Sequence, residues 1–153
     1  MSGIAKHADV SHADASHAMT PAAAEGLLRA AGLRPTRQRR DLACLMFAHG
    51  DRHFCAEDLH AEAQDARVDV SLATVYNTLH QFTQAGLIKA VAVDSNRTWF
   101  DTNVDDHHHF FVEEDNAVMD VPSSSISVCD LPEPPEGMEI ERVDVIVRLR
   151  RKR

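Results

Sequence analysis

The sequence predicts an α+β protein, in which a helical first half is followed by a second half that favours strands. Four helical segments are predicted between Thr20 and Gly86, and in the second and fourth of them apolar residues recur at helical spacing. Two short runs of strand-forming residues come next, at 87–93 and 98–101, joined by a polar turn. Beyond residue 102 the composition becomes acidic, strand-forming and punctuated by proline. We therefore expect a disordered arm at 1–19, a first domain at 20–102 and a second, smaller domain at 103–153.

Residues typical of helix N-caps predict where three of the four helices begin, namely Thr20, Thr36 and Ser71. Pro21 suits the first position of the first helix. The third helix opens with two acidic residues, whose charges suit the positive end of a helix dipole. The helices are therefore expected from Thr20 to near Gly32, from Thr36 to about 49–51, from Ala56 to Ala66 and from Ser71 to Gly86.

The second domain contains three runs that favour strands, at 109–113, 118–121 and 138–149. In the last run every second residue is valine or leucine, at positions 143, 145, 147 and 149. Residues 131–137 include three prolines, which cannot donate backbone hydrogen bonds to a neighbouring strand. We therefore expect a loop between the second and third strands.

Charge is distributed unevenly along a chain whose formal net charge is -8. Arginines cluster over 34–40, whereas Arg142 is the only base between residues 101 and 147. The early cluster can therefore meet phosphate despite the net charge. A second basic cluster at 148–153 is either a solvated tail or a second contact to DNA.

Other features of the composition indicate where the protein works. No stretch approaches the roughly 20 apolar residues that a membrane span needs, and the first residues lack an apolar signal-peptide run. We therefore expect a soluble, cytoplasmic protein without a membrane partner. Cys44, Cys55 and Cys129 form no CxxC pair, so neither a disulfide framework nor cysteine-bound structural zinc is expected.

The last three helices followed by a strand hairpin match a winged helix, in which the final helix enters the DNA major groove. The side of that helix opposite its apolar stripe carries hydrogen-bonding groups, including Gln81. Amides can contact adenine, hydroxyls can bind phosphates, and arginines, Arg39 among them, can hold the backbone. A merely solvated face is the alternative. The residues predicted to contact DNA are Arg37, Arg40, Ser71, Thr74, Tyr76, Asn77, His80 and Arg97.

A run of two aspartates and three histidines, at 105–109, opens the second domain. Alternation along a strand places His107 and His109 on one face, with Asp106 and His108 on the other. Imidazole and carboxylate groups suit divalent iron, zinc or manganese, and a single imidazole can also bind haem iron. A solvated run is the alternative reading.

Two residues of the first domain, His53 and Asp101, could approach the same place as this run. A metal ion bridging both domains would fix the angle between them, and so the spacing of two DNA-reading helices in a dimer. Such coupling requires that the ion bind two domain arrangements with different affinity.

Several motifs resemble the ferric uptake regulator superfamily over roughly Pro21 to Leu149: LRPTRQR at 33–39, AEDL at 56–59, SLATVY at 71–76 and AGL at 85–87. The segments at 71–82, 105–113 and 131–153 resemble its iron response regulator (Irr) branch more narrowly. The superfamily resemblance implies a winged helix, a small α/β dimerisation domain and metal-controlled binding to A/T-rich inverted repeats. It also implies that Tyr76 contacts bases. The residues that match its interdomain metal site are His53, Asp101, His107 and His109, with Asp106, His108 and Asp120 as candidates for a second site.

The narrower resemblance implies a homodimeric, non-enzymatic regulator, mainly a repressor, of haem-synthesis and iron-homeostasis genes. Haem would act at His107, His108 and His109 and relieve DNA binding. The chain departs from the superfamily pattern at 112–115, where a CxxC is usual, and at Asn77 and Val143, where arginine and histidine are common. The proline-rich loop replaces part of a helix of the dimerisation domain.

Three other functions compete with a haem-relieved regulator. A metal-activated repressor of metal uptake or peroxide-stress genes would use the same histidines with iron, manganese or zinc. A haem-binding interaction module would keep the winged helix for protein contacts. A metalloenzyme is disfavoured because no nucleophile motif, phosphate loop or HExxH accompanies the histidines.

Overall fold

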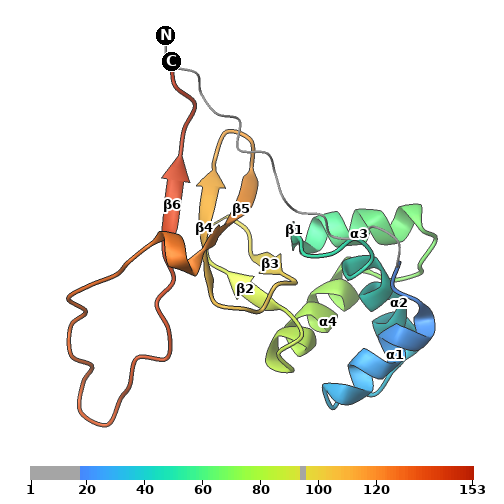
Figure 1. The fold of residues 1–153 in the computed structure, drawn as a ribbon. Coiled ribbons are helices and arrows are strands. Elements are labelled where there is room, and N and C mark those ends of the chain that lie inside the picture. Colours follow the sequence, from blue (N-terminus) through green and yellow to red (C-terminus); the bar gives the residue numbers. More distant parts are fainter. Residues whose placement is uncertain (1–17, 94–95) are drawn as a thin grey trace.

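The computed structural model describes residues 18–93 and 96–153. The arm predicted at 1–19 therefore lies outside the described residues except for its last two positions. Four helices group on one side of the molecule, and the strands of the second domain lie on the other (Figure 1). Among the described residues, no helix is long and apolar enough to cross a membrane.

The predicted helix starts are confirmed, because each N-cap side chain satisfies a free backbone amide. The hydroxyl of Thr20 accepts from Ala23 N at 3.1 Å, that of Thr36 from Arg39 N at 3.3 Å, and that of Ser71 from Thr74 N at 3.1 Å. The four helices are α1 (Pro21–Ala30), α2 (Arg37–Met46), α3 (Ala56–Asp65) and α4 (Leu72–Gln84).

One apolar core holds these helices together. It includes Leu28 of α1, Leu42 and Met46 of α2, Leu59 of α3 and, from α4, Val75, Leu79 and Phe82, all fully buried. The α4 helix ends near the predicted glycine because Gly86 adopts a φ of 77°, a conformation that costs glycine little. Because Val75, Leu79 and Phe82 face this core, the polar side of α4 lies outside it.

The predicted hairpin is part of a three-stranded antiparallel sheet in the order β1-β3-β2. Its strands are β1 (His53–Cys55), β2 (Lys89–Val91) and β3 (Trp99–Asp101). The sequence patterns missed β1, because three residues are too few to show alternation. They also made the hairpin strands longer than they are, and the turn at 94–95 lies outside the described residues.

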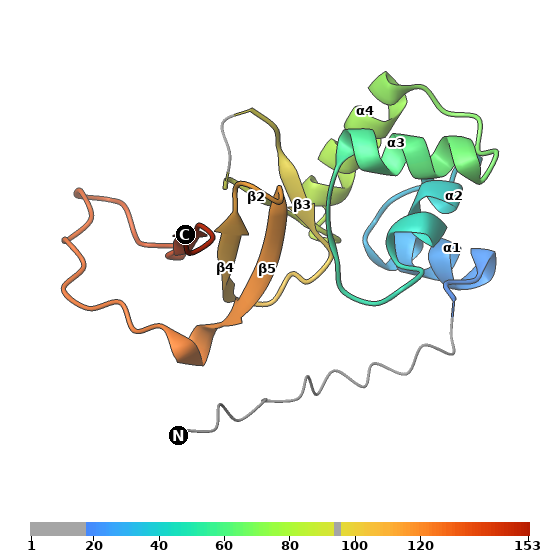
Figure 2. The ribbon, with the colours of Figure 1, turned by 90° about the horizontal axis from the view of Figure 1, so that it is seen from above.

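The second domain is a sheet of three strands in the order β5-β4-β6, followed through the chain as β4 (His107–Val112), β5 (Ala117–Pro122) and β6 (Ile146–Leu149). The strand predicted over 138–149 is therefore wrong before Ile146. At the start of β6, Val145 is held to β4 by two hydrogen bonds: its carbonyl oxygen accepts from His109 N at 3.1 Å, and its amide donates to the ring of His108 at 3.2 Å. The loop expected at 131–137 is longer in the structure, where residues 126–145 form a segment that projects from the body of the molecule in Figures 1 and 2. The one helical element between residues 103 and 153 is the short 3-10 helix Ser123–Ser125.

The two sheets pack against each other through a second apolar cluster. Val91, Val93 and Trp99 of the first sheet region contact Phe111 of β4, with Val118 and Ile146 partly buried beside them. Arg148 adds a hydrogen bond to the carbonyl oxygen of Val93 at 2.6 Å. Figure 2 shows β2 and β3 between the helices and the strands β4 and β5. Apolar packing thus joins residues on both sides of position 102. The division into two domains at that position stays a prediction.

Candidate metal centre

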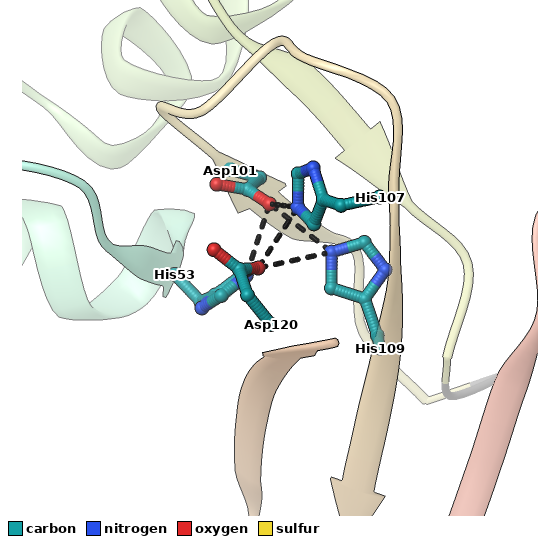
Figure 3. A group of neighbouring side chains, drawn as sticks. All are labelled: His53, Asp101, His107, His109 and Asp120. Carbon is teal, nitrogen blue, oxygen red and sulfur yellow. Dashed lines mark hydrogen bonds and ion pairs between the residues drawn. The ribbon is translucent and has the colours of Figure 1, made fainter. Parts of the chain in front are cut away.

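Five side chains converge where the two sheets meet: His53, Asp101, His107, His109 and Asp120 (Figure 3). One ligand atom from each residue lies within 4.8 Å of all the others. The first two residues come from β1 and β3, and the other three come from β4 and β5. Each of the two sheets therefore supplies part of the cluster.

Strand register explains why these residues meet. His53 lies directly opposite Asp101 in the antiparallel pair β1 and β3, and His109 lies directly opposite Asp120 in the pair β4 and β5. Residues that are opposite each other in an antiparallel pair project from the same face of the sheet. His107 shares that face because it lies two residues before His109.

The ring nitrogens of the three histidines point at the same two carboxylate oxygens. Asp101 Oδ2 lies 2.9, 2.7 and 3.1 Å from the Nε2 atoms of His53, His107 and His109. Asp120 Oδ1 lies 2.8, 2.8 and 3.5 Å from the same three atoms. Three imidazoles and two carboxylates in this arrangement form a donor set that suits divalent iron, manganese or zinc.

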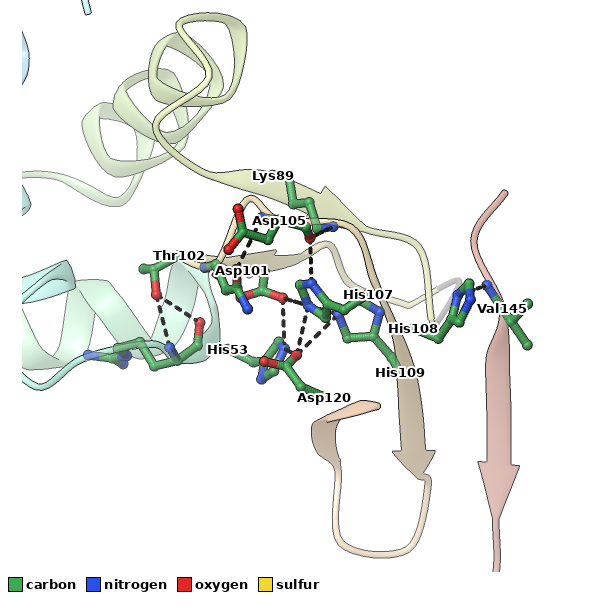
Figure 4. Close-up of polar contacts among 12 residues, drawn as sticks. His53, Lys89, Asp101, Thr102, Asp105, His107, His108, His109, Asp120 and Val145 are labelled. Carbon is green, nitrogen blue, oxygen red and sulfur yellow. Dashed lines mark hydrogen bonds and ion pairs between the residues drawn. The ribbon is translucent and has the colours of Figure 1, made fainter. Parts of the chain in front are cut away.

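Two further observations fit a cation at this point. Among the described residues, the buried Nε2 of His53 has no hydrogen-bond partner, although both carboxylates lie within ion-pair distance. The Nδ1 atom of His107 lies 2.5 Å from the carbonyl oxygen of Asp105, which accepts from it and leaves the Nε2 lone pair facing the cluster. Lys89 donates to the same carbonyl at 3.0 Å (Figure 4).

Burial and charge perturb two of the ligating groups. Burial alone would raise the pKa of Asp101, but the hydrogen bond from His109, the nearby ring of His53 and the amide of Asn103 hold that pKa far below its ordinary value. Burial alone would lower the pKa of His53, but the nearby carboxylate of Asp101, aided by that of Asp120, raises it. The metal-free cluster therefore keeps Asp101 ionised and favours a proton on His53.

These shifts predict how the stability of the metal-free protein depends on pH. A raised pKa of His53 stabilises the fold below the ordinary value of 6.5, and this contribution is lost as pH rises through the folded-state pKa. The depressed pKa of Asp101 stabilises the fold above the ordinary value of 3.8, and that contribution is lost in stronger acid. We expect the free energy of unfolding to fall as the pH rises above about 6.5. Urea denaturation of chelator-treated protein would measure it, and an equal fall in His53→Gln would contradict the assignment to His53.

The predicted second metal site is not assembled. Asp120 belongs to the five-residue cluster, because strand pairing places it opposite His109. His108 points to the other face of β4, where its Nδ1 atom accepts from Val145, and Asp106 is exposed. The grouping of Asp120 with Asp106 and His108 was therefore wrong. The three histidines predicted to bind haem are likewise divided between two faces of one strand.

The residues of α4 that are predicted to contact DNA lie on its outer side. Tyr76 is 42% exposed, and Asn77 and His80 are also exposed, while Thr74 is half-buried. The hydroxyl of Ser71 caps the helix and also donates to the Thr74 hydroxyl at 3.0 Å. The outer face of α4 therefore presents side chains to solvent as the winged-helix prediction requires.

Several of the predicted basic contacts have acidic or amide partners within the protein. Arg37 lies 3.8 Å from Asp41, and Arg40 lies 3.1 Å from the same carboxylate. Arg39 donates to the side-chain oxygen of Gln81 at 3.2 and 2.9 Å, which ties α2 to α4. Arg97 is exposed, with one guanidinium nitrogen 3.8 Å from the sulfur of Cys55. The contact of Arg39 with Gln81 was not predicted because its partner comes from another helix, whereas Asp41 lies in α2 with Arg37 and Arg40.

The fold is that of a winged-helix protein in which a second sheet is joined to the first through a cluster of side chains that could hold a metal ion. The chain belongs to the ferric uptake regulator family, whose model matches residues 30–148. This membership confirms the family predicted from the motifs. The α+β fold class is also confirmed by the solved structures described next.

The chain is 35% identical over 88 residues to the ferric uptake regulation protein of Haemophilus ducreyi, covering 56% of this chain and 59% of that protein. It is 35% identical over 100 residues to the corresponding protein of Pseudomonas fluorescens, covering 65% and 81%. The match thus spans about three fifths of the Haemophilus protein's length. The ferric uptake regulator of Pseudomonas aeruginosa, solved with manganese, superposes with a TM-score of 0.66 at 27% identity, covering 85% of this chain and 98% of that one. The Vibrio cholerae regulator, at 18% identity and a TM-score of 0.65, shows the fold alone.

Proposed function

We propose that this chain is a metal-responsive transcriptional regulator, which binds DNA with α4 and senses a divalent ion at His53, Asp101, His107, His109 and Asp120. The observation that carries this proposal is the origin of the five ligands. Two come from the sheet of the winged helix and three from the second sheet. An ion held there joins the two sheets directly, and the manganese of the Pseudomonas aeruginosa structure supports an ion of this kind.

The site influences α4 through the strands that carry its ligands. Phe54 and Phe100, which adjoin His53 and Asp101 in sequence, are buried in the same core as Val75, Leu79 and Phe82 of α4. A shift of β1 and β3 relative to β4 therefore moves the packing behind the DNA-reading helix. When bound, the ion supplies positive charge that draws both carboxylates and three imidazoles together. Such an ion alters DNA affinity only if it binds the DNA-competent arrangement more tightly than others.

Symmetry of the DNA site favours two copies of the chain. An inverted repeat presents two identical half-sites, and a homodimer places one reading helix in each of them. The proposed partner is therefore a duplex carrying an A/T-rich inverted repeat. Its phosphates would be contacted from Arg37, Arg40 and Arg97, which makes the affinity depend steeply on salt.

The finer proposal, that haem relieves DNA binding at haem-synthesis and iron-homeostasis genes, rests on the resemblance to the iron response regulator. The geometry favours a small ion over haem at this cluster, because His107 and His109 face two carboxylates while His108 faces away. In the present conformation, the Nδ1 atom of His108 accepts a backbone amide, so the proton of the neutral ring lies on Nε2. Haem would therefore require this ring to change its hydrogen bonding.

One binding experiment tests these functions. Fluorescence anisotropy would follow chelator-treated protein on an A/T-rich inverted repeat, with no addition, with manganese or ferrous iron, and with haem. We expect the metal to tighten binding by about 5- to 150-fold, the usual range of allosteric coupling. Magnesium and a scrambled duplex are the controls. Tight binding without metal that haem weakens would instead support the haem-relieved regulator, and specific binding that none of the additions changes would refute metal sensing.

A further inference from the structure

Three elements of the winged helix meet at one exposed polar corner. Glu57 lies in the first turn of α3, Tyr76 lies on α4, and Arg97 precedes β3. The hydroxyl of Tyr76 donates to Glu57 Oε1 at 2.5 Å. This hydrogen bond connects an acid on one helix with the predicted base-contacting residue of the next helix.

The start of α3 holds Glu57 in place. Asp58 Oδ2 accepts from the backbone amide of Cys55 at 3.3 Å and from its thiol at 3.0 Å, as in a capping box. Arg97 reaches the same thiol from the wing at 3.8 Å. Glu57 is therefore presented from a helix end that is itself hydrogen-bonded and tied to the wing.

This corner places the exposed carboxylate of Glu57, near Arg97, on a surface predicted to meet phosphates. An exposed carboxylate there repels DNA, so its presence needs a compensating use. Tyr76 has two rotatable side-chain bonds and is 42% exposed, so its ring would sample several rotamers without a tether. The hydrogen bond to Glu57 selects one of them before any DNA arrives.

We propose that Glu57 is a positioning residue that sets the sequence selectivity of α4, by holding the ring of Tyr76 in the orientation that meets bases. Its charge repels the phosphates of every duplex alike, so the effect on the ratio of specific to non-specific affinity comes from the tether to Tyr76. This inference rests on the proposed DNA binding by α4.

A titration that uses no DNA tests the tether itself. The chain contains a single tyrosine, so tyrosinate absorbance in an alkaline titration reports Tyr76 alone. The hydrogen bond to Glu57 raises the pKa of Tyr76 above its ordinary value of 10.0. We expect Glu57→Ala to return this pKa to the ordinary value and Glu57→Gln, which keeps an acceptor without charge, to lower it less. An unchanged titration in both variants would overturn the proposal.

DNA binding tests whether the tether confers selectivity. Affinities of the wild type, Glu57→Ala, Tyr76→Phe and the double variant would be measured on the inverted repeat and on a scrambled duplex of equal composition. We expect each single variant to lower the ratio of the two affinities by about 2- to 10-fold, the usual cost of ordering one side chain on binding. The double variant should match Glu57→Ala, because both substitutions remove one interaction.

Matched controls separate selectivity from charge and from folding. Glu133→Gln removes one acid in the exposed loop between β5 and β6 and should leave the ratio unchanged. Thermal unfolding would show that the Glu57 variants fold, and alanine suits a helical position. A wild type that prefers the repeat together with a Glu57→Ala ratio equal to the wild type's would overturn this inference alone. A wild type without any preference would refute DNA recognition by α4, and this inference with it.

Discussion

Replacing Asp101 by asparagine is expected to lower the affinity of the protein for manganese or ferrous iron by at least about 100-fold, the upper end of what outer-shell changes cost. Asp101 is fully buried, and its Oδ2 atom is the point at which the rings of His53, His107 and His109 converge. The amide keeps the shape of the side chain but removes the negative charge. Competition with a fluorescent chelator would measure the affinity.

Asp106→Asn is the matched control for this substitution. It removes the same charge next to His107, but from an exposed side chain that belongs to no part of the cluster. Its metal affinity should equal that of the wild type. Asp120→Asn should weaken binding less than Asp101→Asn, since the Asp120 side chain is 34% exposed and water can replace it. Equal metal affinity in Asp101→Asn and the wild type would remove Asp101 from the proposed site.

Phe82→Ala is expected to lower the free energy of unfolding by about 3 to 5 kcal/mol, the usual cost of deleting a buried aromatic ring. Phe82 is fully buried on the inner side of α4, where it packs with Leu28, Leu79 and Ile88 in the main core. Removal of the ring would leave a cavity that this core cannot fill unless α4 moves. Urea denaturation followed by circular dichroism would measure the loss.

Asn77→Ala on the outer side of the same helix separates stability from recognition. Asn77 is exposed, so its truncation should change the free energy of unfolding by no more than about 0.5 kcal/mol. It should still weaken binding to the inverted repeat, by about 10-fold or more if the amide reads an adenine. A large loss of stability in Asn77→Ala, or none in Phe82→Ala, would mean that the inner and outer sides of α4 are assigned wrongly.

The helices could be predicted because their determinants lie within a few residues of one another. Thr20, Thr36 and Ser71 each bond an amide three residues ahead, and the apolar spacing of α4 is repeated every turn. The alternation of His107 and His109 along one strand could be predicted for the same reason. These interactions need no knowledge of any distant part of the chain.

Strand pairing between distant segments could not be predicted in the same way. The three residues of β1 form a strand only because β3 pairs with them, and this pairing brings His53 opposite Asp101. Asp120 was predicted to lie with Asp106 and His108, because its position opposite His109 depends on the register of β5 against β4. The last strand begins only at Ile146, because the part of it that pairs with β4 is limited to Ile146–Leu149.

The sequence by itself determined the family and the four helices, and it predicted as one group four of the five side chains that lie together in the candidate metal centre. Only the tertiary structure decided that Asp120 completes this centre, that Glu57 holds Tyr76, and that the wing packs on the second sheet through Trp99 and Phe111. The physical reason is the range of the interactions. Caps and periodicity act within one element, whereas register and side-chain packing depend on which distant segments the fold brings into contact.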